Sequence, residues 1–185
     1  MVRNFEPREL PDDVVERILA NARRGPSAGF TQGVDLLVLR APAERAAFWA
    51  AVSPDHGFER AGWPGVYNAA LLVVPFAHKQ AYLDRYAAPD KAWTDRDERR
   101  WPVPFWYVDA AFSALLALLT AVDAELGALF FGVRDPDALR RAFGVPAQFE
   151  PIGAIAIGYP APDRPSGSLR RGRRPADEVV HRGGW

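Results

Sequence analysis

The longest apolar stretch of the chain covers residues 109–126, where Ala, Leu, Phe and Val occupy every face of the predicted helix. A helix without a polar side is expected at the centre of a domain or in a subunit interface. Asp109, Asp123 and Glu125 leave an uncharged run that is too short for a membrane span. Residues 127–132 then predict a short buried strand between two glycines. Because glycine permits close approach of a backbone or a ligand, we expect a bound cofactor beside this strand.

The remaining apolar pattern predicts a mixture of helices and strands. Apolar positions at helical spacing, together with Pro and Gly at the ends, predict helices over residues 12–24, 43–53 and 136–143. Buried strands are predicted over residues 34–40, 69–76 and 151–159. Because the strands and helices do not alternate regularly, the predicted fold class is α+β.

Residues 79–107 predict a helix followed by a charged loop that is interrupted by prolines. A loop of this length inside a compact domain is usually functional. We therefore predict that residues 79–107 form a lid or a pocket wall.

Composition favours one domain over residues 1–185, because this length is sufficient to bury a core. Lys+Arg and Asp+Glu are equal at 23 each, so the net charge indicates neither nucleic acid nor an anionic membrane as a partner. The charge is nevertheless uneven along the chain. Residues 164–185 carry a cluster of arginines, and such a basic arm on a neutral protein indicates a specific anion. The arginines are Arg164, Arg170, Arg171, Arg173, Arg174 and Arg182.

The absence of cysteine excludes disulfides, thiol nucleophiles and cysteine-based metal sites. His56, His78 and His181 are isolated from one another, so we expect no metal site. No hydrophobic leader opens the chain, and a cytoplasmic location is therefore expected.

Several separated segments resemble one family, the FMN-dependent nitroreductases. Residues 2–5 (VRNF) are similar to the end of the family's Arg-x-x-x-Arg-x-Phe opening, whose first arginine would fall before Met1. Residues 24–33 (RGPSAGFTQG) resemble its Ala-Pro-Ser-x-x-Asn-x-Gln-Pro loop. Residues 151–160 (PIGAIAIGYP), 171–175 (RGRRP) and 178–180 (EVV) resemble its C-terminal part. The apolar helix running into Gly-x-x-x-x-Gly fits as well.

The resemblance implies an α+β sandwich with a mostly antiparallel central sheet flanked by helices. It also implies an intertwined homodimer that builds two FMN sites across its interface. Residues 164–185 would form an arm that reaches over the partner subunit, and the apolar central helix would lie in the interface.

The resemblance further implies the residues that bind FMN. Arg171 and Arg173 match the basic pair that binds the phosphate, because guanidinium groups bind phosphate oxygens bidentately. Arg3 matches a cation near flavin N1 and O2, where it would stabilise the reduced ring. The backbone amide of Phe131 matches the contact to N5. The other predicted contacts are Pro26, Ser27, Ala28 and Gly29, contributed across the dimer, with Leu129 and Gly132 on the strand.

The predicted acceptor site is aromatic, as suits a flat substrate. Phe30 stands where the family usually has Asn, and Gly33-Val34 replace Pro-Trp. No Gly-x-Gly-x-x-Gly follows a strand, so no Rossmann nicotinamide site is predicted. The predicted substrate-binding residues are Phe30, Trp93, Trp101, Phe105 and Trp106.

The resulting hypothesis is an FMN-dependent oxidoreductase that uses NAD(P)H to reduce nitroaromatics, quinones or similar acceptors by a ping-pong mechanism. No catalytic acid or base is assigned. Two alternatives remain open: a family branch with another flavin reaction (desaturation, dehalogenation or breakdown of the flavin), and a non-catalytic flavin-binding protein. A third alternative is nucleic-acid binding by the arginine arm, which would depend strongly on salt.

Overall fold

The central strand of the protein is apolar on both faces. All seven residues of β2 (Leu71–Ala77) are buried in the computed structural model, which describes residues 1–185. Because successive side chains of a strand point to opposite faces, Leu71 and Val73 contribute to one hydrophobic cluster while Leu72 and Val74 contribute to another. Both faces of the sheet therefore have to be covered by helices.

The sheet contains five strands, and every neighbouring pair is antiparallel. Its main order is β1-β2-β5-β3, and β4 pairs with the end of β2. The bounds are Val34–Leu39 for β1, Gly127–Phe131 for β3, Glu150–Pro151 for β4 and Ala154–Gly158 for β5.

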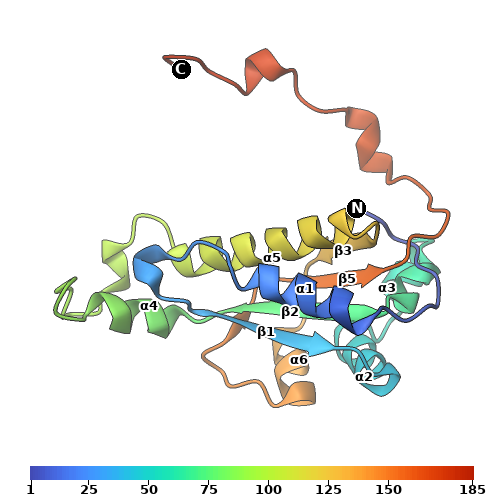
Figure 1. Ribbon diagram of the computed structural model, residues 1–185, viewed down its shortest axis with the longest axis horizontal. Coiled ribbons are helices and arrows are strands. Elements are labelled where there is room, and N and C mark those ends of the chain that lie inside the picture. The colour runs from blue at the N-terminus through green and yellow to red at the C-terminus, as the bar shows by residue number, and fades with distance from the viewer.

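Helices cover both faces of this sheet (Figure 1). On one face α5 (Phe105–Asp123) packs against α1 (Asp12–Ala22) and against the strands, and on the other face α2 (Pro42–Val52) packs against α6 (Pro136–Phe143). The short helices α3 (Gly57–Arg60) and α4 (Lys79–Tyr86) lie at opposite ends of the molecule. Single 3-10 turns cover Ala28–Phe30, Pro64–Asn68, Glu98–Arg100, Gly167–Arg171 and Ala176–Glu178. The predicted α+β class, with an antiparallel sheet between helices, is confirmed.

Helix α5 begins at Phe105, one turn before the predicted start, and its two sides differ. Small residues on one side, Ala110, Ala114, Ala117 and Ala121, are at most 4% exposed and let α5 lie close to its neighbours. The opposite side exposes an apolar stripe that is 40–62% accessible, formed by Phe112, Leu115, Leu119 and Val122. By length and mean hydropathy (1.7) alone, α5 could cross a membrane. Its uncharged run is nevertheless interrupted by Asp109, which is buried in the fold, and 44% of its most apolar segment is buried inside the chain. Within one chain, α5 is therefore buried on one side only.

The strand predicted over residues 151–159 is interrupted at Gly153. A Cβ at this position would lie 2.5 Å from the Phe130 ring and 2.8 Å from the Phe131 carbonyl oxygen, and the φ angle is +151°. Only glycine meets both requirements. The chain therefore forms the short β4 and then the separate β5.

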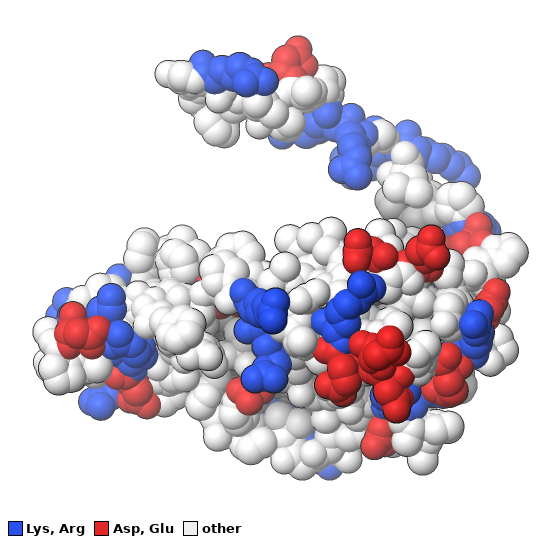
Figure 2. Space-filling view, viewed as in Figure 1, with Lys and Arg blue, Asp and Glu red and all other residues white.

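The C-terminal arm, residues 164–185, leaves the body after β5 and extends away from it (Figures 1 and 2). Beyond Pro165 its side chains are almost all exposed, and its only regular structure is two 3-10 turns. Nothing in the core of its own chain specifies the direction of this arm.

Candidate functional site

The first predicted site residue, Arg3, lies beside an indole ring. Its segment is held in place because the Val2 backbone N–H donates to the Ala128 carbonyl oxygen over 3.0 Å, and the Arg3 N–H donates to the Asp163 carboxylate over 2.7 Å. The Arg3 guanidinium stands 5.2 Å from the centre of the Trp63 ring. A cation at this distance is attracted to the ring face, so Trp63 orients Arg3.

Trp63 also contacts Arg164, the first residue of the C-terminal arm. The Arg164 guanidinium lies 5.2 Å from the same indole ring and donates to the Ala61 carbonyl oxygen over 2.7 Å. In return, the Trp63 Nε1–H donates to the Arg164 carbonyl oxygen over 3.2 Å. Two guanidinium groups are thereby held beside one aromatic ring. No role was assigned to Trp63 from the sequence.

Next to Trp63 lies a pocket of about 440 Å³ at the end of β3. Its walls are mostly apolar and aromatic, and Asp55 and Arg134 stand together at 4.0 Å among its lining residues. A Cβ built on Gly132 would meet no atom within 4 Å, so the backbone here faces open space. The lining includes Phe58, Trp63, Phe131, Gly132 and Val133.

Two strand residues that were predicted to contact the cofactor occupy different environments. The Phe131 ring is half-buried and stacks on Trp49, with ring centres 5.5 Å apart and planes inclined by 15°. Leu129 is only 2% exposed and packs in the core beneath α2 and α6. Phe131 thus borders the pocket, whereas the Leu129 side chain is enclosed by the core.

The loop of residues 25–33 forms a second, smaller pocket of about 180 Å³ with α1, β1 and α5. Pro26 and Ser27 line it together with the buried carboxylate Asp109. Phe30 stands 77% exposed at the tip. Ala28 and Gly29 lie against α4, since the Arg85 Nε donates to the Gly29 carbonyl oxygen over 2.9 Å.

The two pockets lie at opposite ends of the folded subunit. The loop is next to α4, whereas Trp63 adjoins α3, and Figure 1 draws α3 and α4 at the two ends of the molecule. A single chain therefore does not bring Pro26–Gly29 and Arg3 to one ligand.

The predicted phosphate-binding pair, Arg171 and Arg173, lies on the arm. Both side chains are exposed and neither forms an ion pair, while the neighbouring Arg174 pairs with Glu178 at 3.2 Å. Figure 2 shows the basic side chains of the arm separated from the body. Two uncompensated guanidinium groups are thus available to an anion, and within one chain they lie apart from both pockets.

The aromatic residues of segment 79–107 pack on one another. Trp101 is central, with ring-centre distances of 5.5 Å to Trp93, 5.9 Å to Phe105 and 6.0 Å to Trp106. Tyr86 joins this cluster at 4.4 Å from Trp101. The predicted acceptor-binding residues therefore stand on the side of loop 25–33 and not beside Phe131.

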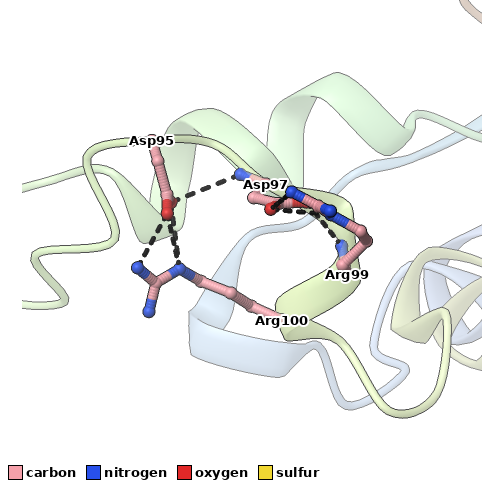
Figure 3. Close-up of polar contacts among 4 residues, drawn as sticks. All are labelled: Asp95, Asp97, Arg99 and Arg100. Carbon is pink, nitrogen blue, oxygen red and sulfur yellow. Dashed lines mark hydrogen bonds and ion pairs between the residues drawn. The ribbon is translucent and has the colours of Figure 1, made fainter.

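The charged part of this segment is neutralised locally (Figure 3). Arg100 pairs with Asp95 at 2.7 Å and Arg99 pairs with Asp97 at 2.6 Å. The hydrogen bond from the Arg99 side chain, followed by that from its backbone N–H, lowers the pKa of Asp97 to about 2. These exposed pairs balance the charges of Asp95 and Asp97 within the loop.

The comparisons with known proteins agree with this architecture. The sequence model of the Nitroreductase family matches residues 1–159. A putative NADH dehydrogenase/NAD(P)H nitroreductase of Methanothermobacter thermautotrophicus is 27% identical over 166 residues, which cover 86% of this chain and 72% of that protein.

Solved structures have the same fold. A nitroreductase family protein of Streptococcus pneumoniae gives a TM-score of 0.74 at 18% identity, over 98% of this chain and 94% of the other. An FMN-dependent nitroreductase of Clostridium difficile gives 0.68 at 18% identity, over 100% and 94%. At such low identity these structures show the fold alone. The family match spans every strand of the sheet, and the chain belongs to the nitroreductase family.

Proposed function

We propose that this protein is an FMN-dependent oxidoreductase that takes electrons from NADH or NADPH and reduces a flat acceptor such as a nitroaromatic compound or a quinone. The observation that carries this proposal is the family match over residues 1–159. FMN, when bound, would supply the hydride chemistry, and the protein would supply binding, orientation and the exclusion of water.

The residues present fit a flavin nucleotide. The open space above Gly132 leaves room for a flat ring beside the aromatic wall of Phe58 and Trp63. Arg3 lies beside Trp63, a lining residue of this pocket, and would supply the cation that stabilises negative charge on a reduced ring. Arg171 and Arg173 carry the uncompensated positive charge that a phosphate group requires.

A homodimer would unite these parts. Arg3 and Gly132 lie toward one end of the folded subunit, and loop 25–33 lies at the opposite end. A second copy therefore supplies the missing half of each site. The exposed stripe on α5 supports this arrangement, because contiguous apolar surface usually marks an interface. Residues 164–185 would then reach over the partner and bring Arg171 and Arg173 to the phosphate, while residues 79–107 would form a wall of the acceptor site.

The decisive experiment is the visible absorption spectrum of the purified protein with added FMN, followed by anaerobic titration with NADH and NADPH. The expected result is a bound flavin whose absorption near 450 nm is bleached by at least one nucleotide and restored by a quinone. Bound flavin that neither nucleotide bleaches would support a non-catalytic flavin-binding protein, and a protein that binds no flavin would overturn the proposal. Oxidation of a substrate without added nucleotide would instead favour another reaction of the family.

A further inference from the structure

One buried carboxylate connects α5 to loop 25–33. Asp109 is 3% exposed, and no basic side chain forms an ion pair with it. Its Oδ2 accepts hydrogen bonds from the Ala28 backbone N–H and from the Tyr82 hydroxyl, each over 2.8 Å. A carboxylate is costly to bury without a partner, so these two donors are the interactions that keep Asp109 in this position.

The loop that Asp109 holds has an unfavourable backbone conformation. The φ angles of Gly29, Phe30 and Gln32 are +61°, +53° and +55°. Residues other than glycine rarely adopt such angles, and they do so where the surrounding structure compensates the cost. The exposed Phe30 side chain makes no compensating contact in the core. The compensation therefore comes from hydrogen bonds to the loop backbone.

Two of these bonds differ in the origin of the acceptor. The Gln32 N–H donates to the Ser27 Oγ over 2.8 Å within the loop. The Ala28 N–H, by contrast, donates to Asp109 in the helix beneath. Asp109 is thus a buried side chain of the long helix that bonds directly to the loop backbone.

Aromatic rings of α4 close the outer side. A Cβ at Gly33 would lie 2.5 Å from the Tyr82 ring, and one at Gly29 would lie 2.7 Å from the Tyr86 ring. Burial, and then the bond to Asp109, raises the pKa of Tyr82, so its hydroxyl remains a neutral donor at physiological pH. The loop is therefore held both by the rings of α4 and by the carboxylate of Asp109.

We infer that Asp109 is a positioning residue for the cofactor, which acts through the Ala28 N–H by holding residues 26–29 in the conformation that would lie against the flavin ring. This inference rests on the proposed function, in which these residues form the shelf for FMN. Asp109 itself transfers no proton and acts on the flavin only through the loop.

The test compares four variants of the full-length protein. Asp109→Ala removes both bonds, Asp109→Asn keeps an acceptor for Ala28, and Tyr82→Phe removes only the bond from the Tyr82 hydroxyl. The matched control is Thr120→Val, because Thr120 is a buried polar residue of the same helix that is 7% exposed and bonded to Asn21 and Leu116, away from the loop.

The first readout is FMN affinity, measured by flavin fluorescence alongside thermal unfolding. Asp109→Ala is expected to raise the Kd for FMN roughly tenfold, the effect of one hydrogen bond to a charged group. Asp109→Asn should recover most of this loss, Tyr82→Phe should lose less than Asp109→Ala, and Thr120→Val should keep the wild-type Kd. Equal Kd values for Asp109→Ala and Thr120→Val would overturn the inference.

The second readout requires no flavin. Amide hydrogen exchange of the flavin-free protein is expected to become faster at residues 26–33 in Asp109→Ala, and to remain at the wild-type rate there in Thr120→Val. Unchanged exchange in Asp109→Ala would overturn the inference. If Asp109→Ala does not fold, Asp109→Leu, which fills a similar volume and has no acceptor, replaces it in both readouts. A wild-type protein that binds no FMN would overturn the proposed function instead, and the exchange rates would still decide whether Asp109 holds the loop.

Discussion

Loop 25–33 and the C-terminal arm are both proposed to contact FMN, and the chain builds them in opposite ways. The loop is bonded to α5 through Asp109 and to α4 through Arg85. The arm is exposed over nearly its whole length, and Arg171 and Arg173 form no ion pair in their own chain. The loop is thus positioned within its own chain, while the arm would acquire its position only from the proposed dimer interface. Variants in the loop should therefore affect the stability of the subunit, whereas variants in the arm should affect FMN binding alone.

The largest effect is expected from separating the proposed subunits, because this would remove both contact surfaces from each site. Leu115→Glu combined with Leu119→Glu places two charges on the exposed stripe of α5, where an apolar interface cannot solvate them. We expect a monomer that retains its helical content and binds no FMN, as measured by light scattering and flavin fluorescence.

A control for this separation is Ala50→Glu, which adds a charge at an exposed position of α2 on the other face of the sheet. It should leave the dimer intact. A double variant that stays dimeric and binds FMN normally would contradict the proposed interface.

The next largest effect is expected from variants of the arm alone. Arg171→Ala and Arg173→Ala should each weaken FMN binding by about 10- to 100-fold, which corresponds to one charge-assisted contact to phosphate. The melting temperature of the flavin-free protein should not change, because both side chains are exposed. Arg182→Ala is the matched control within the arm and should bind FMN as the wild type does. Equal losses in all three variants would indicate a nonspecific charge effect.

Two glycines compare the packing of the two regions directly. Gly29 has a φ angle of +61° and a neighbouring ring 2.7 Å from its ideal Cβ, whereas Gly167 of the arm has no atom within 4 Å of its ideal Cβ. Gly29→Ala should lower the free energy of unfolding by about 1–3 kcal/mol through strain and overlap. Gly167→Ala should leave the free energy of unfolding within about 0.5 kcal/mol of the wild-type value in urea denaturation. Equal effects would show that the arm is packed as tightly as the loop.

The smallest effect is a pH dependence confined to the loop side. Burial raises the pKa of Tyr82 in the folded protein above its ordinary value of 10.0. Its contribution to stability is therefore fully present below pH 10 and declines as pH rises above 10, because the unfolded state then releases a proton that the folded state retains. Tyr82→Phe should flatten the loss of stability between pH 10 and 11, measured by urea denaturation at each pH. A wild-type curve that is flat over this range would contradict the buried phenol.

Much of the fold could be predicted because its elements have strong local patterns. The bounds of β2 were predicted to within two residues from its apolar run. The bounds of α6 were predicted equally well from its Asp-Pro start and its Gly end. The start of α5 was missed because Phe105 and Trp106 follow prolines and read as loop. The division of the last strand at Gly153 depends on the Phe130 ring, which lies in another strand, so no local pattern could reveal it.

Only part of the candidate site was predicted from the sequence. The segments that hold Arg3, residues 26–29 and Arg171 were found through family resemblance, and their roles remain predictions. Trp63 and Asp109 were missed as site residues, since Asp109 served only as an argument against a membrane span. A lone carboxylate within an apolar helix was the available signal, because such a group must find hydrogen-bond donors once it is buried.

The sequence by itself determined the α+β class, the family, and a long helix too apolar to stand alone in water. These follow from local periodicity and from motifs read in order along the chain. Only the tertiary structure decided that α5 buries one side and exposes the other, that Asp109 meets Ala28 and Tyr82, and that the two halves of the proposed site lie at opposite ends of the molecule. These facts depend on which distant segments the sheet brings together, and pairing between strands far apart in the chain leaves no trace in any single stretch of residues.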